Sequence, residues 1–156
     1  MIPASAIADA RAAQAQTGAS DTAAALALSV AGPESGYNPS AIGDNGTSFG
    51  FTQLHQGGGL GDGYTQDQLL DPVKNLAIAM GDIQASLNNG ATPYEAIGPW
   101  STRDTAIGNF DEALAALGAA PAATAGAGVG GGAGLLSGGV LALAAGAAAV
   151  IWLVGG

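Results

Sequence analysis

PESGYNPSAIGDNGTSFGFTQL, residues 33–54, is the stretch that decides the expected fold. In the segment before it, Leu26 and Val30 lie four residues apart, which predicts a helix with one apolar face. Glu34 is the next position on that face. Because Pro33 removes a helical hydrogen bond, we expect a kink or a break just before it, with Glu34 in a last helical turn. The pattern therefore places a carboxylate beside apolar side chains.

The rest of this stretch is rich in turn residues. Asp44-Asn45-Gly46 is a turn signal, and the alternation over 48–54 favours a short strand. Glycines recur over 57–63, which is typical of a loop. We therefore expect one small hairpin followed by a glycine loop.

Helical patterns surround the predicted hairpin. Small residues near the N-terminus predict a helix that ends near Gly18, and Ser20 is a favourable N-cap for the helix that leads to Glu34. Three further helices are predicted: one from Asp71-Pro72 to Gly90, one opened by the capping box Thr92–Glu95, and one with Ile107, Phe110, Leu114 and Leu117 on its apolar face, ending at Gly118. Residues 1–118 are thus expected to form a mainly α head.

The order of motifs in this head resembles that of the lysozyme-like lytic transglycosylases, and residues 48–59, SFGFTQLHQGGG, look closer to phage-encoded members than to bacterial ones. Glu34 with Ser35 is followed by a Ser-x-Gly-x-x-Gln motif made by Ser48, Gly50 and Gln53. The resemblance covers residues 21–117 and implies a lysozyme-like α+β fold. It also implies that Glu34 is the catalytic acid and that Ser48 and Gln53 lie in the floor of a sugar cleft.

The later motifs match the family more loosely. Asp71-Pro72 with Asn75 resembles the start of the family's next helix, and the resemblance implies that Trp100 is an aromatic residue of the cleft wall. No Ala-Tyr-Asn motif follows the second long helix, and Tyr94 is our candidate for its tyrosine. A further departure is Pro33, directly before the glutamate.

The chemistry of glycosidic bond cleavage agrees with this choice of acid. The acid must still be protonated near neutral pH, so its pKa must be raised by an apolar setting. Glu34, beside the apolar stripe of its helix, is the carboxylate placed in that way, whereas a solvated glutamate would be the ordinary alternative. We expect Glu34 to be catalytic.

A second carboxylate would decide between hydrolysis and transglycosylation. Asp44, ten residues after Glu34, is the candidate, although its Asp-Asn-Gly sequence is also an ordinary turn. Without a second acid, the resemblance implies that Glu34 cuts the MurNAc–GlcNAc β-1,4 bond and leaves a 1,6-anhydro product. We favour the transglycosylase and keep the two-carboxylate lysozyme as the alternative.

Composition excludes several other classes of site. The chain has 156 residues, no Cys, one His, and 3 basic against 12 acidic residues, for a net charge of -9. Nucleic-acid binding and Cys-ligated or His-rich metal sites are therefore not expected, and no cofactor is predicted. His55 has no Ser or Asp partner at a recognisable sequence spacing, so we expect it in a loop or in the wall of the cleft.

The C-terminal third differs sharply from the head. Residues 113–156 carry no charge, residues 119–134 read as a Gly/Ala-rich linker, and residues 135–156 hold a run of twenty mostly apolar residues, 135–154. A helix of that length spans about 30 Å, which is the hydrocarbon thickness of a bilayer. We expect a transmembrane helix here, and a buried helix in an oligomer or a disordered tail are the alternatives.

Glycines in this third suggest a contact between helices. Small residues recur every four positions, a pattern that lets two membrane helices approach closely, although a Gly/Ala-rich stretch can show it by chance. The residues of this candidate ridge for self-association are Gly126, Gly130, Gly134 and Gly138.

The place of action follows from these expectations. Residues 1–16 do not read as a secretory signal, yet peptidoglycan lies outside the cytoplasmic membrane. We therefore expect an enzyme carried in a phage virion that cuts the wall during genome ejection, with residues 135–154 in a membrane or against hydrophobic virion proteins. The alternatives are a release enzyme and a non-catalytic membrane-penetration protein with a vestigial head.

Overall fold

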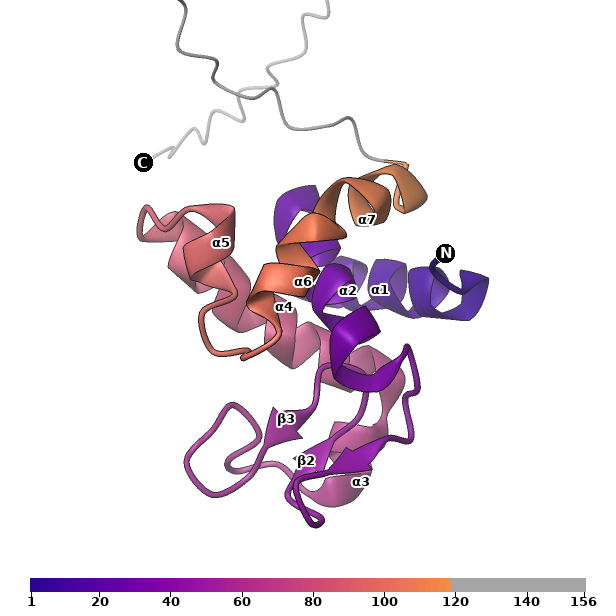
Figure 1. Cartoon of the computed structure of the whole chain (residues 1–156), viewed down its shortest axis with the longest axis vertical. Helices are drawn as coiled ribbons and strands as arrows, with labels where there is room; N and C mark the ends of the chain where they lie inside the picture. Colours follow the sequence, from indigo (N-terminus) through magenta and orange to yellow (C-terminus); the bar gives the residue numbers. More distant parts are fainter. Residues whose placement is uncertain (119–156) are drawn as a thin grey trace, which may run out of the picture. The chain divides into compact units, whose positions relative to one another are not determined.

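The computed structural model describes residues 1–118, which form a mainly helical fold with a small three-stranded antiparallel sheet (Figure 1). The helices are α1 (Ala4–Thr17), α2 (Asp21–Ser35), α3 (Gln66–Leu70), α4 (Pro72–Asn88), α5 (Pro93–Ala96), α6 (Arg103–Gly108) and α7 (Phe110–Ala116). The strands are β1 (Ile42–Gly43), β2 (Ser48–Phe49) and β3 (Leu54–His55). The predicted linker, apolar segment and glycine ridge lie outside the described residues.

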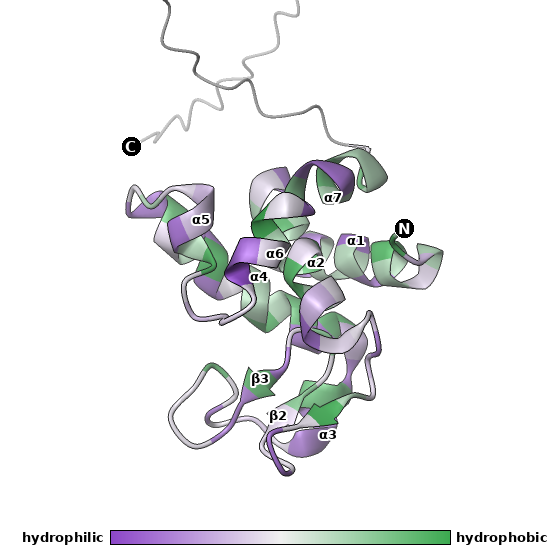
Figure 2. Cartoon of the chain, viewed as in Figure 1, coloured by the Kyte–Doolittle hydropathy of each residue, from purple (hydrophilic) through white to green (hydrophobic). Residues whose placement is uncertain are grey.

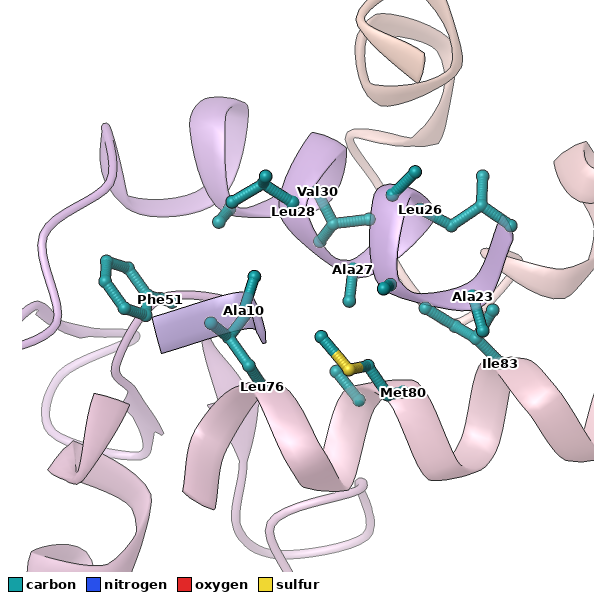
Figure 3. Close-up of a cluster of buried hydrophobic side chains, with 14 of the residues drawn as sticks. Ala10, Ala23, Leu26, Ala27, Leu28, Val30, Phe51, Leu76, Met80 and Ile83 are labelled. Atoms are coloured by element: carbon teal, nitrogen blue, oxygen red, sulfur yellow. The ribbon is translucent and has the colours of Figure 1, made fainter. Parts of the chain in front are cut away.

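Helix α2 is the centre of the fold. It packs against α1, α4, α6 and α7, and every residue from Ala23 to Ala31 is buried. Hydrophobic residues are frequent along α1, α2 and α4 (Figure 2), and Leu76, Met80 and Ile83 of α4 point toward α2 (Figure 3). A helix that is apolar all round belongs in the interior, so the expectation of a single apolar face was too narrow.

The end of α2 carries the residue of greatest interest. Glu34 lies in the last turn, as predicted, but α2 does not break before Pro33 and continues to Ser35. Proline is tolerated because it removes only one backbone donor, close to the end of the helix. Gly36, in the left-handed conformation with φ 63°, then ends α2 and donates its N–H to the carbonyl of Gly32.

The sheet is larger than the predicted hairpin. Its order is β1-β2-β3, with Ser48 opposite Gly43 on one side and opposite His55 on the other. The single strand expected over 48–54 is instead two strands, because the chain turns between Phe49 and Leu54. Within that turn Gly50 adopts φ 74°.

A buried asparagine of α4 ties this turn to the helices. The Oδ1 atom of Asn75 accepts hydrogen bonds from the backbone N–H (3.0 Å) and the hydroxyl (2.8 Å) of Thr52. Its Nδ2 atom donates to the carbonyls of Phe49 and Leu69, each at 2.9 Å. A Cβ on Gly50 would clash with Nδ2 of Asn75 and with the carbonyl oxygen of Leu69, so glycine is required there. Asn75 thereby fixes the sheet relative to α4.

Local signals at the helix ends were predicted correctly in several places. Ser20 caps α2, Asp71 caps α4, and Thr92 with Glu95 forms the capping box of α5. The single helix expected to end at Gly118 is instead two, α6 and α7, which meet at Asn109.

Among residues 1–118, no helix is both long and apolar enough to cross a membrane.

Candidate functional site

Glu34 is partly buried and hydrogen-bonded at the end of α2. The hydroxyl of Thr102, the residue just before α6, donates a hydrogen bond of 2.5 Å to Oε1 of Glu34. Burial raises the pKa of the Glu34 carboxyl, the hydrogen bonds from Thr102 pull that pKa down, and the negative charge of Asp44 raises it again. The net effect is a raised pKa, the property that a general acid near neutral pH requires.

The Glu34 carboxyl opens into a cavity of about 340 Å³. Its lining residues are Glu34, Asp44, Ser48, Gln53, His55, Pro99, Trp100 and Ser101. A larger cavity of about 530 Å³ shares four of them, Gln53, His55, Pro99 and Trp100, and extends along the glycine loop. The two cavities thus lie next to each other, and we refer to them together as the cleft. Glu34 lines only the smaller one.

A chain of hydrogen bonds lies in the same cavity as Glu34. Ser48 Oγ donates to Oδ2 of Asp44 at 2.5 Å and lies 3.1 Å from Nδ1 of His55. Asp44 is held by the turn between β1 and β2, and His55 is the cross-strand neighbour of Ser48. The structure therefore brings together Asp44, Ser48 and His55.

Two of the expected cleft residues also hold the wall together. The indole N–H of Trp100 donates to the carbonyl of Thr52 at 2.8 Å, which joins the segment before α6 to the sheet. The Nε2 atom of Gln53 donates to the carbonyls of Gly50 (2.9 Å) and Ala41 (3.3 Å). Both side chains line the cleft, and their N–H groups donate to backbone carbonyls.

Tyr94 is not among the residues that line the two cavities. Its hydroxyl donates to Oδ1 of Asp104 at 2.7 Å, and the guanidinium of Arg103 lies 4.9 Å from the centre of its ring. The side chain is thus engaged on the surface of α5 and α6, and the structure does not bring it to Glu34.

The sequence did not point to Thr102, nor to Pro99 and Ser101, which line the cavity that holds Glu34. Thr102 belongs to no motif and lies 68 positions from Glu34, so only the tertiary fold reveals the contact. The partners of His55 were also missed, although the register of a hairpin through Ser48 could have revealed them. Across residues 1–118, no group of three or more His, Asp or Glu side chains is placed to hold a metal ion.

No protein-family model, curated protein or solved structure matches this chain. A cleft with one partly buried acid, a second carboxylate and an aromatic wall suits acid–base catalysis on a polar substrate that extends beyond the reacting bond.

Proposed function

We propose that this chain is a lysozyme-like lytic transglycosylase that cuts the MurNAc–GlcNAc β-1,4 bond of peptidoglycan. The observation that carries the proposal is Glu34, whose carboxyl has a raised pKa and opens into the cleft beside Trp100. The order of Glu34-Ser35 and the Ser48-x-Gly50-x-x-Gln53 motif supports the same assignment.

In the proposed reaction Glu34 acts first as an acid and then as a base. It gives its proton to the glycosidic oxygen as the bond from that oxygen to the anomeric carbon of MurNAc breaks. The 6-hydroxyl of the same MurNAc then attacks the anomeric carbon and returns its proton to Glu34. The products are a free 4-hydroxyl on GlcNAc and a 1,6-anhydro-MurNAc end, and no water is consumed.

The shape of the cleft supports a glycan as the substrate. The cavity that holds Glu34 lies next to the larger cavity, which offers room for further sugar rings beside the reacting bond. Trp100, held by Thr52, is almost fully buried and gives the wall of both cavities a rigid support. The cavity that holds Glu34 is lined mainly by polar side chains, among them Asp44 and Gln53, which suits the many hydroxyls of a sugar.

A two-carboxylate lysozyme is the second candidate, and Asp44 is the observation that favours it. Asp44 lines the same cavity as Glu34, and its charge acts on the Glu34 carboxyl. If Asp44 activated a water or attacked the sugar, the products would carry reducing ends in place of anhydro ends.

The proposed place of action is the bacterial wall, reached from outside by an enzyme carried in a phage virion. This part rests on the resemblance to phage-encoded members and on the uncharged run 135–154, which would lie in a membrane or against hydrophobic virion proteins. Mass-spectrometric analysis of purified particles tests it. Absence of the protein from particles, with presence in late lysates, would make it a release enzyme.

The catalytic proposal is tested by replacing the acid alone. Glu34→Gln keeps the shape of the side chain but removes its transferable proton, so lysis of purified walls should fall by about 10²–10⁴-fold. Glu112→Gln, at an exposed glutamate of α7, is the matched control and should lyse walls at the wild-type rate. A Glu34→Gln protein that clears walls as fast as its control contradicts the proposal.

A further inference from the structure

The hydroxyl of Ser48 lies between an acid and the single histidine of the chain. Its oxygen is 2.5 Å from Oδ2 of Asp44 and 3.1 Å from Nδ1 of His55. Ser48 is only 1 % exposed, whereas the side chains of Asp44 and His55 are 72 % and 45 % exposed. A buried hydroxyl thus connects two groups that face the cleft.

The direction of each hydrogen bond follows from which of these three groups carries a proton that it can donate. An ionised carboxylate can only accept, so the single proton of the Ser48 hydroxyl goes to Asp44. The Ser48 oxygen can then only accept from His55, which requires a proton on Nδ1. Asp44 Oδ2 and His55 Nδ1 are 3.9 Å apart, too far for a direct hydrogen bond that could replace this arrangement.

A neutral imidazole with its proton on Nδ1 has an acceptor at Nε2. Within residues 1–118, no hydrogen bond engages Nε2 of His55. The His55 side chain lines both cavities of the cleft, so it stands where the smaller one meets the larger one. Glycans present hydroxyls and acetamido N–H groups, which are donors that match an acceptor at this place.

Resting on the proposed function, we propose that Asp44 and Ser48 hold His55 in its Nδ1-protonated tautomer, and that its Nε2 accepts a hydrogen bond from a hydroxyl or acetamido N–H of the bound glycan. His55 is thereby a substrate-orienting residue at the junction of the two cavities. Ser48 and Asp44 act through it as positioning residues. This assigns the hydroxyl of Ser48 to the protein's own network and not to the sugar.

The tautomer is measured first, without any substrate. Because the full chain has one histidine, two-bond proton–nitrogen correlation spectra of histidine-labelled protein give signals from His55 alone. With the pH raised until the ring is neutral, we expect Nδ1 to be the protonated nitrogen. In Ser48→Ala, which removes the acceptor, the protonated form should shift towards Nε2. A wild-type ring protonated on Nε2 overturns the proposal.

The glycan contact is measured next, in the Glu34→Gln background so that no cleavage occurs. Removal of one hydrogen bond by His55→Ala should raise the Kd for soluble peptidoglycan glycan fragments by about 3- to 10-fold. Ser48→Ala should also raise the Kd, because the imidazole of His55 is kept but is no longer held in its Nδ1-protonated tautomer. An unchanged Kd in His55→Ala overturns the contact.

The two measurements separate this inference from the proposed function. If Glu34→Gln binds no glycan fragments and the wild type cuts none, the proposed function and the glycan contact both fail, whatever the tautomer. If the wild type cuts glycans but His55 is protonated on Nε2, only the inference fails.

Discussion

Thr102 donates a hydrogen bond of 2.5 Å from its hydroxyl to Oε1 of Glu34, although the two residues are 68 positions apart in the chain. This contact holds the carboxyl at the end of α2 against the start of α6. It also favours the ionised form of Glu34 and so opposes the effect of burial on the pKa. Burial therefore raises the pKa of Glu34 while the hydrogen bond from Thr102 lowers it, and a substitution can change either effect.

Removal of the Thr102 hydroxyl should move the pH–rate profile. Thr102→Val keeps the shape of the side chain and loses the donor, so the pKa of Glu34 should rise further. Since the proposed role of Glu34 requires its protonated form, activity should be lost as the pH rises through this pKa, and the basic limb of the profile should move to higher pH. Thr105→Val, at an exposed position of α6, should leave the limb in place. If the basic limb of Thr102→Val moves to lower pH, the Thr102 hydroxyl does not lower the pKa of Glu34 and the expectation is contradicted.

The raised pKa of Glu34 should also cost stability at neutral pH. The folded protein holds the proton of Glu34 more tightly than the unfolded chain does, so stability falls as the pH rises from the ordinary value of 4.5 through the folded pKa. Glu34→Gln removes this loss. The variant should therefore be more stable than the wild type at pH 7, and the difference should shrink below pH 4. Thermal unfolding at pH 7 and below pH 4 measures this difference. If Glu34→Gln is less stable than the wild type at pH 7 but not below pH 4, the expectation is contradicted.

Asn75 should be the polar residue on which the sheet depends most. Asn75→Leu leaves the N–H and hydroxyl of Thr52 and the carbonyls of Phe49 and Leu69 without their partner. We expect a loss of about 3 kcal/mol in the free energy of unfolding. Asn88→Leu, at the exposed end of the same helix, should change it by about 0.5 kcal/mol or less. Equal losses in chemical denaturation would contradict the anchoring role.

Much of the helical frame could be predicted because its signals are local. The N-cap Ser20, the pair Asp71-Pro72 and the capping box Thr92–Glu95 each specify a helix start within a few residues. The same kind of signal placed Glu34 in a last helical turn. These predictions needed no knowledge of the rest of the chain.

What could not be predicted depends on contacts between distant segments. The turn that divides 48–54 into two strands is held by Asn75 of α4, and the surroundings of Glu34 depend on Thr102. Burial of α2 on all sides requires α1, α4, α6 and α7 to surround it. No periodicity within a single segment contains that information.

Asp44 separates the two candidate mechanisms. In a transglycosylase the substrate supplies the nucleophile, so Asp44→Asn should keep most of the activity. Loss of its charge should lower the pKa of Glu34 and move the basic limb of the pH–rate profile to lower pH. Initial rates across a pH series measure both effects. A loss as deep as that of Glu34→Gln would establish Asp44 as a second catalytic carboxylate.

Mass spectrometry of the products from purified glycan strands tests most directly the proposal that Glu34 drives non-hydrolytic cleavage of peptidoglycan. The wild type and Glu112→Gln should both release fragments with 1,6-anhydro-MurNAc ends, each lighter by one water than a fragment with a reducing end. Glu34→Gln should release almost none. Fragments with reducing ends would establish hydrolysis, and strands left intact by the wild type would contradict the claim altogether.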